Sequence, residues 1–407
     1  MEEIYRYPTY YNIEYVDNGI LEIRGELLPE NGEIERDASK FRFISPETAA
    51  KFPRTTLLEG DIVLSVRGTM GKVGLIPKEL AGANITANLI RLSPRKDMVS
   101  RDFLRWAFLT EGFVARLDAS SPKTTIKTIT VPALKAILLP LPPLEQQRAI
   151  SHTLSTVRGA KKARQKELEL ERERKAALMQ YLFTHGTRSE ARKQTEIGEM
   201  PESWQVVRLG DIDLDISDGN YAEKYPRQSE FVKEGIPFIR ANNIDNLSIT
   251  WDDMKFISVE KHNQLRKGHL KLNDVLVTTR GEIGKIALVT RDFVDCNINA
   301  QIVRINAKEL IIHAFFLYSL AFEKSQIQFK NLKTGSTLPQ LPIGKLRQLK
   351  IGLPAQQEQK DIATVLLACD TKVNTLQRES ALLDELFRAM LEELMTGRIS
   401  TQPLIEF

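Results

Sequence analysis

Two short basic turns contain the residue types and spacing best suited to contact with a phosphate group. RGTMGK runs from Arg67 to Lys72, and RGEIGK repeats it from Arg280 to Lys285. Each turn lies between two strand-like apolar runs, and its two glycines let backbone and cation approach a DNA phosphate. The pattern also suits a plain hairpin with glycines at positive φ. It is not a nucleotide-binding P-loop, because two residues instead of four separate the glycines and no serine or threonine follows the lysine.

Two polar loops carry further cations. Residues 324–350 hold six lysines and arginines and no acidic residue, and residues 119–144 hold three lysines and no acidic residue. Within them, KTTIKT and KTGSTLPQ add hydroxyl and amide groups, which suit phosphate and base-edge contacts. A solvated basic loop is the alternative. We predict DNA contacts at Lys123, Lys127, Lys333, Thr337 and Gln340.

Side chains that read bases are expected where the sequences around the two turns differ. Arginine suits guanine, and asparagine or glutamine suits adenine. The candidates precede and follow the apolar run from Ile236 to Ile239, and they are Arg227, Gln228, Arg240, Asn242 and Asn243, with Tyr221 as a further candidate.

No catalytic or metal-binding pattern accompanies these cations. The sequence has no Gly-rich cofactor loop, no Asn-Pro-Pro-aromatic methylase motif and no Walker lysine. The five histidines show no ligand spacing, and Cys296 and Cys369 are expected as buried thiols in a reducing cytoplasm. We therefore expect no catalytic residue and no metal site in this chain.

Two long helical patterns must position the loops. Each follows a Leu-Pro pair, at Leu141 and at Leu353, and each ends near a glycine, Gly186 or Gly397. Apolar residues recur at alternating spacings of four and three, which is typical of a heptad seam, although an ordinary amphipathic helix is the alternative. The predicted seam residues are Ile150, Leu154, Val157, Leu178 and Leu182 in the first helix, and Ile362, Leu366, Val373, Leu376, Leu383, Phe387 and Met390 in the second.

The charges of the two helices are complementary. Residues 144–197 hold 12 Lys/Arg against 7 Asp/Glu, and residues 355–407 hold 5 against 9. The first seam is polar in its middle, where the aliphatic stems of lysine and arginine can cover the partner helix. We therefore predict that the helices pair with each other in antiparallel orientation.

An internal repeat organises the whole chain. Arg280 follows Arg67 by 213 residues, Asn297 follows Asn84 by 213, and the helices are related by 212. The first copy lacks a counterpart of the opening segment 204–211, which would fall before Met1. Either that strand is absent or the start codon lies downstream of the natural one.

Length and composition set broader limits. The 407 residues, 42% apolar and 27% charged, allow two or three domains with full cores. No apolar run of membrane-spanning length and no secretory signal is found, which favours a cytoplasmic protein.

These features resemble the specificity subunit of type I restriction–modification enzymes. The motifs that carry the resemblance are IGEMPESWQVVRLGDI (197–212), the paired RGxxGK turns and LPPLEQQ (141–147), with LPAQQEQ (353–359) as a looser match. The resemblance implies an α+β chain with two repeated mixed α/β target recognition domains, joined by two long antiparallel coiled-coil helices in a pseudo-two-fold arrangement. It implies recognition domain 1 at 1–143, without its opening segment, and helix 1 at 144–185. A linker at 186–197, recognition domain 2 at 198–354, helix 2 at 355–396 and a tail at 397–407 follow.

The resemblance also implies a function. Such a subunit chooses an asymmetric bipartite site on double-stranded DNA, with an unread gap set by helix length. It would dock two methylase (M) subunits through its helices and motor/nuclease (R) subunits through the complex. S-adenosylmethionine, ATP and Mg²⁺ would be bound by those partners, and this chain would not be an enzyme.

Two other readings remain open. One is a single-chain DNA nuclease or methyltransferase with an unrecognised motif, which the absent motifs disfavour. The other is a coiled-coil scaffold without a nucleic-acid role, which the basic loops disfavour.

Overall fold

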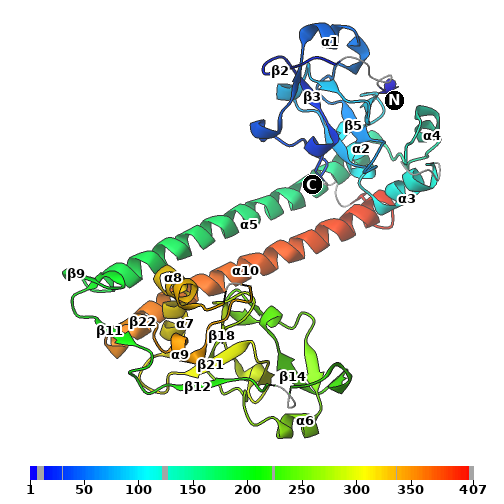
Figure 1. Cartoon of the computed structure of the whole chain (residues 1–407). Coiled ribbons are helices and arrows are strands. Elements are labelled where there is room, and N and C mark those ends of the chain that lie inside the picture. The colour runs from blue at the N-terminus through cyan, green and yellow to red at the C-terminus, as the bar shows by residue number, and fades with distance from the viewer. Residues whose placement is uncertain (7–12, 30, 122–126, 222–224, 336, 403–407) are drawn as a thin grey trace. The chain divides into compact units, whose positions relative to one another are not determined.

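The chain folds into two compact units, each with one globule and one half of each long helix. A computed structural model describes residues 1–6, 13–29, 31–121, 127–221, 225–335 and 337–402. The first unit comprises 1–165 and 377–407, and the second comprises 166–376 (Figure 1). Among the residues that the structure describes, no helix has both the length and the hydropathy that a membrane crossing requires.

The globule of the first unit contains two four-stranded sheets and four short helices. One sheet has the antiparallel order β1-β8-β5-β6, and the other has the order β2-β4-β3-β7, in which β3 and β7 are parallel. The elements are β1 (Glu3–Arg6), β2 (Tyr15–Val16), β3 (Ile20–Ile23), β4 (Phe43–Ile44), α1 (Pro46–Ala50), β5 (Ile62–Ser65), β6 (Val73–Leu75), β7 (Asn84–Ile85), β8 (Leu89–Ser93), α2 (Arg101–Ala107), α3 (Glu111–Ala119) and α4 (Val131–Lys135).

The globule of the second unit repeats this plan. Its two four-stranded sheets have the orders β12-β21-β18-β19 and β13-β17-β14-β20, and β14 and β20 are again parallel. The elements are β9 (Arg192–Thr195), β10 (Gly198–Pro201), β11 (Gln205–Arg208), β12 (Asp215–Asp218), β13 (Phe231–Val232), β14 (Ile236–Ile239), β15 (Ile244–Asp245), β16 (Ser248–Ile249), β17 (Lys255–Ile257), α6 (Val259–Gln264), β18 (Val275–Thr278), β19 (Ile286–Leu288), β20 (Asn297–Ile298), β21 (Ile302–Asn306), α7 (His313–Ala321), α8 (Glu323–Leu332), α9 (Ile343–Leu346) and β22 (Lys350–Leu353).

The sequence pattern predicts one strand at 84–92 and one amphipathic helix at 102–117, and both predictions are wrong. The run 84–92 is not one strand, because a turn whose Leu89 N–H donates to Thr86 O divides it into β7 and β8, which lie in different sheets. The run 102–117 is not one helix, because the Thr110 side chain accepts a hydrogen bond from Phe113 N–H and starts α3 anew. The segment 186–197, expected as a linker, also contains β9, which pairs with β10.

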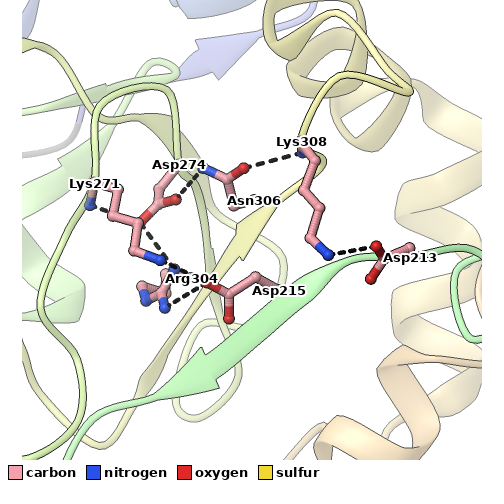
Figure 2. A network of polar contacts seen from close by, with 7 residues as sticks. All are labelled: Asp213, Asp215, Lys271, Asp274, Arg304, Asn306 and Lys308. Atoms are coloured by element: carbon pink, nitrogen blue, oxygen red, sulfur yellow. Dashed lines mark hydrogen bonds and ion pairs between the residues drawn. The ribbon is translucent and has the colours of Figure 1, made fainter.

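A buried ionic network supports the sheet that carries each basic turn. In the second unit, Figure 2 shows Arg304 between two carboxylates, with Nη2 2.9 Å from Asp215 Oδ2 and Nη1 3.3 Å from Asp274 Oδ2. In the first unit, Arg91 Nε lies 2.6 Å from Asp61 Oδ2, and Glu3 stands where the second unit has Asp215. Because a buried guanidinium without partners would be strongly destabilising, each network fixes three strands in register.

The two long helices are tethered to the globules by one glutamine each. Helix α5 spans Leu144–His185, and helix α10 spans Gln356–Met395. Near the start of α5, buried Gln147 accepts from Ser100 N–H at 2.8 Å and donates to Pro142 O at 2.8 Å. Gln359 does the same in α10, accepting from Ile312 N–H at 2.9 Å and donating to Pro354 O at 3.0 Å. The glutamine after each Leu-Pro pair therefore locks the direction in which the helix leaves its globule.

Within each unit the halves of α5 and α10 pack antiparallel. In the first unit, Ile150 and Leu154 pack with Leu391 and Leu394. In the second, Leu182 packs with Ile362 and Leu366. The remaining predicted seam residues are buried or partly buried: Val157, Leu178, Val373, Leu376, Leu383, Phe387 and Met390.

Ion pairs replace apolar contacts in the polar middle of the seam. Lys161 pairs with Asp384 and Arg164 with Glu379 in the first unit, and Lys175 pairs with Asp370 in the second. In these three pairs the cation belongs to α5 and the anion to α10, in agreement with the opposite net charges of the two helices, whereas a fourth pair, Lys372 of α10 with Glu167 of α5, has the opposite arrangement.

The strand pair β11 and β22 of the second unit has no counterpart among the described residues of the first. β11 pairs antiparallel with β22 and so joins the two ends of the second globule. The segment of the first unit that corresponds to β22 is 138–141, which is in no strand. Its Leu138 and Leu141 are 83% and 50% exposed, because nothing among the described residues covers this edge.

Candidate nucleic-acid interface

A buried hydroxyl shapes each basic turn in the same way. Ser65 Oγ donates to Thr69 O at 2.7 Å and accepts from Lys72 N–H at 2.9 Å. In the second unit, Thr278 Oγ1 donates to Glu282 O and accepts from Lys285 N–H at 3.0 Å. The four glycines of the turns have φ between +71° and +91°, as the alternative of a plain hairpin also expects.

Each basic turn lies against the polar loop that the sequence singled out separately. Arg67 forms an antiparallel bridge with Thr128, and Ile129 N–H donates to Val66 O at 3.0 Å. Arg280 forms the equivalent bridge with Gln340, and Leu341 N–H donates to Thr279 O at 2.8 Å. Segments more than 50 residues apart therefore combine into one surface in each unit, which we call the turn–loop face.

The turn–loop face of the first unit includes arginines that sequence reasoning did not select. Arg24 and Arg42 line a hollow together with Arg67 and Lys72. Arg6 is close by, and its burial, followed by the neighbouring charge of Arg67, lowers the pKa of its guanidinium. The repeat contained a signal for Arg24, because it follows β3 just as the selected Arg240 follows β14.

The arginines of the hollow are held by neighbours. Arg42 Nε donates to Glu22 at 2.9 Å and its guanidinium lies 4.2 Å from the ring centroid of Tyr15. The Arg24 guanidinium donates to Lys40 O at 2.9 Å. Such fixed guanidinium groups lose little freedom when they bind a phosphate or a guanine edge.

The second unit presents a different set of side chains around its turn. The guanidinium of Arg280 lies 5.1 Å from the ring centroid of Tyr221. Exposed Gln301 accepts from Asn299 Nδ2 at 3.0 Å, and the first unit has Asn88 and Thr86 at the corresponding positions. The two faces therefore share a backbone frame and differ in their hydrogen-bonding groups.

Two candidate base readers have their functional groups occupied within the protein. Asn243 is fully buried, and its side chain accepts from Arg240 N–H at 3.0 Å and donates to Asp252 O at 2.7 Å, so the expected base contact at Asn243 is wrong. Arg240 donates to Asp253 Oδ2 at 2.8 Å. The hydrogen bonds from Arg240 and then Lys255 lower the pKa of Asp253 to about 2. Asn243 thus stabilises the conformation of the loop. Arg240 contacts DNA only if a phosphate or base replaces Asp253 as its partner.

The other predicted contacts lie on the surface of their units. Arg227, Gln228, Asn242, Lys333, Thr337 and Gln340 are exposed, Lys127 pairs with Asp118 at its exposed position, and Lys285 lies 2.8 Å from Glu282. Lys123 lies outside the described residues. Of the basic run 324–350, Lys324 donates to Glu199 O and Lys350 pairs with Glu196, so these two cations serve the fold.

Comparisons with known proteins agree with this organisation. The family model of the type I restriction modification DNA specificity domain matches residues 9–172 and 201–385. The type I restriction enzyme MjaVIII specificity subunit of Methanocaldococcus jannaschii is 27% identical over 99% of this chain and 88% of its own length. The EcoBI specificity subunit of Escherichia coli is 24% identical over 79% of this chain and 70% of its own length.

A solved structure shares the fold. One chain of a structure concerning complex assembly and conformational transition of the type I R-M system has a TM-score of 0.58 and 19% identity, and the match covers 95% of both chains. At this identity the likeness shows the fold alone.

Proposed function

Since the chain belongs to the type I restriction–modification DNA specificity family, we propose that its two turn–loop faces read the two halves of a bipartite DNA site. The chain is the sequence-specificity subunit of such a complex. This assignment rests on one contact that both units repeat: the RGxxGK turn pairs with the polar loop, at Arg67 with Thr128 and at Arg280 with Gln340.

The chemistry of the faces supports a division of labour between phosphate and base contacts. The turn backbone and its lysines suit phosphates, which fix register without reading sequence. Asn88 in the first unit and Gln301 in the second are neutral exposed groups beside the cations, and they can read base edges in the major groove. Because these groups differ between the units, the two half-sites differ and the whole site is asymmetric.

The proposal assigns the chemistry of the complex to partners. Methylase subunits, two in number, dock on the helices and bind S-adenosylmethionine, and motor/nuclease subunits use ATP and Mg²⁺. The chain itself neither methylates nor cuts DNA. The ion pairs between α5 and α10 support a ruler role for the helices, since they fix the register of one helix on the other within each unit.

The test is a selection from random duplex DNA with the chain bound to its methylase partner, followed by sequencing. We expect two short blocks of preferred bases with an unread gap of constant length. A double substitution Arg67→Ala with Lys72→Ala should weaken the preference in one block only. A single palindromic block, or equal loss in both blocks, would contradict the assignment of one half-site to each face.

The absence of catalysis is tested separately on the purified chain. It should leave both supercoiled DNA and S-adenosylmethionine unchanged, whereas addition of the methylase partner should yield methylated adenine. DNA cleavage or methylation that copurifies with the chain through successive purification steps would overturn the non-catalytic role.

A further inference from the structure

Three side chains with metal-ligating atoms meet in the second unit. They are His262 on α6, His269 in the following loop and Asp295 before β20, and one ligand atom from each lies within 4.8 Å of the other two. His262 Nε2 is 3.4 Å from Asp295 Oδ2, and His269 Nδ1 is 3.1 Å from Asp295 Oδ1. His262 is buried and Asp295 is exposed, so the group is open to solvent on one side.

The second nitrogen of each ring faces an oxygen acceptor. His269 Nε2 lies 2.5 Å from Leu265 O, and His262 Nδ1 lies 2.6 Å from Asn297 Oδ1. A backbone carbonyl only accepts, so His269 Nε2 carries the proton of the neutral ring. When both rings are neutral and carry their proton on these nitrogens, the lone pairs of His269 Nδ1 and His262 Nε2 are available to an ion placed between them and the Asp295 carboxylate. Metal-bound histidines show this pattern, in which the distal N–H donates to a carbonyl and fixes the tautomer.

The corresponding positions of the first unit hold no ligand. Leu57 N–H donates to Ala83 O and Gly82 N–H to Leu57 O, as Leu270 N–H donates to Cys296 O and Asp295 N–H to Leu270 O. These matching hydrogen bonds show that Gly82 is at the position equivalent to Asp295, and that Thr56 is at the position equivalent to His269. Ser45 and Ser258 cap the helices α1 and α6 alike, which equates Ala49 with His262.

The backbone at Asp295 is unusual for a residue with a side chain. Its φ is +61°, and Gly82 has φ +92° at the equivalent place. This left-handed conformation favours glycine, and aspartate is one of the few other residues that adopt it readily. The second unit therefore has a carboxylate and two imidazoles where the same backbone in the first unit has glycine, threonine and alanine.

We propose that the second unit binds a divalent transition-metal ion of the zinc class through His262 Nε2, His269 Nδ1 and the Asp295 carboxylate. Imidazole nitrogen with carboxylate oxygen suits Zn²⁺, and its bond lengths imply ligand–ligand separations of about 3.3 Å in a tetrahedron. The nitrogen–oxygen separations of 3.4 Å to Asp295 Oδ2 and 3.1 Å to Asp295 Oδ1 are close to that value, and because one ligand atom from each residue lies within 4.8 Å of the others, the site must close slightly around the ion. Water completes the coordination on the exposed side.

The ion has a structural role in this position. It joins α6, the loop at His269 and the segment that leads into β20 (α6 is labelled in Figure 1). Gln301, three residues after β20, lies beside the basic turn, since Thr279 N–H donates to Gln301 O, and its side chain accepts from buried Asn299. Metal binding would thus stiffen the support of one face and leave the other unit unaffected. The inference about binding itself does not depend on the proposed function.

The test uses the full chain without an affinity tag, stripped with a chelator and titrated with Zn²⁺ against a competing indicator. We expect one ion per chain and a rise of the Tm with Zn²⁺. Co²⁺ should give the visible absorption of a low-symmetry site with nitrogen ligands. Three variants import the residues of the first unit: His262→Ala, His269→Thr and Asp295→Gly. Each should weaken binding by about tenfold or more.

Asp295→Gly is the decisive variant, because glycine accepts the left-handed backbone and the fold is retained. His152→Ala, at an exposed histidine of α5, is the matched control and should bind Zn²⁺ like the wild type. Failure of the wild-type chain to bind Zn²⁺ stoichiometrically would overturn the site and leave a hydrogen-bonded His–Asp–His cluster. Unchanged affinity in Asp295→Gly would overturn it equally.

Discussion

At the scale of single residues, Gly68 and Gly281 of the basic turns are required for their backbone conformation and not for space. A Cβ at Gly281 would meet no atom within 4 Å, and the φ of this residue is +71°. Gly281→Ala should therefore lower the free energy of unfolding by about 1 kcal/mol, the strain of an alanine at positive φ. Urea denaturation of the purified chain measures this change.

The control for this substitution is Gly159→Ala. A Cβ at Gly159 also meets no atom within 4 Å, but this glycine lies inside α5, where alanine is favoured. It should raise the free energy of unfolding by about 0.5–1 kcal/mol. A loss of stability at Gly159, or none at Gly281, would mean that backbone conformation does not decide these positions.

Arg280 is the residue whose loss should be most specific to one half-site. Its guanidinium lies over the Tyr221 ring and its backbone bridges to Gln340, so it is fixed before DNA arrives. Arg280→Ala should weaken binding of the target duplex by about 10- to 100-fold and relax the base preference in one half-site. Fluorescence anisotropy of the methylase-bound chain at one fixed salt concentration measures the affinity.

Lys308→Ala is the matched control for charge. Lys308 is half exposed and pairs with Asp213 in the network of Figure 2, so the substitution removes one positive charge from the same unit. The affinity should change by less than about threefold, since a distant surface charge is largely screened. Equal effects of the two substitutions would show that Arg280 acts only through net charge.

At the scale of elements, paired charges replace apolar contacts in the middle of the long helices. The hydrogen bond from Lys161 lowers the pKa of Asp384 below its ordinary value of 3.8, and Arg388 acts in the same direction. A carboxylate with a lowered folded-state pKa stabilises the fold above its unfolded-state pKa, and this contribution disappears as the pH falls through the folded-state pKa. The pair is partly exposed, so its contribution is small.

The resulting prediction concerns Asp384→Asn. It should lower the free energy of unfolding by about 0.5 kcal/mol at neutral pH, and the difference from wild type should shrink as the pH falls below the ordinary carboxyl pKa of 3.8. Urea denaturation at several pH values checks this. Glu385→Gln, at the next and exposed position of α10, is the control and should show a smaller difference at every pH. A difference in the free energy of unfolding that increases as the pH falls would contradict the lowered pKa of Asp384.

Elements were predictable from sequence where one local pattern was sufficient. The strand–turn–strand runs at 62–75 and 275–288 and the two long helices have clear apolar periodicity, and the structure contains them. The run 84–92 was misread, because its apolar residues continue across the turn at Thr86. Arg24 and Arg42 were missed, since only tertiary folding brings them beside Arg67.

The His262, His269 and Asp295 cluster was missed for a related reason. Rules for metal ligands use short spacings within one element, whereas these residues come from a helix and two loops that span 34 positions of sequence. The unused signal was the repeat itself. Aligning the copies sets Asp295 opposite Gly82, at a position where the backbone requires a left-handed residue.

At the scale of the whole molecule, two copies of one plan imply exchangeable specificity. Replacing residues 198–354 with the corresponding domain of another family member should change one half of the modified site and leave the other half as it was. The boundaries are suitable, because β11 and β22 close the second globule at 205–208 and 350–353. Mapping methylated adenines in cells with the matching methylase measures the result, and a change in both halves would contradict independent reading.

The unpaired edge at 138–141 makes the two units unequal in local stability. In the second unit, the amides of β22 that face β11 are protected by the ladder, so they exchange with deuterium only when the ends of that globule separate. In the first unit, the corresponding amides have no ladder among the described residues, and Leu138 is 83% exposed. Hydrogen–deuterium exchange should therefore be at least about tenfold faster at Leu139 than at Ile351, and equal protection would exclude an open edge. The first globule should also be the first part of the chain that a protease cuts, so a cell would begin to degrade this subunit at the reader of one half-site.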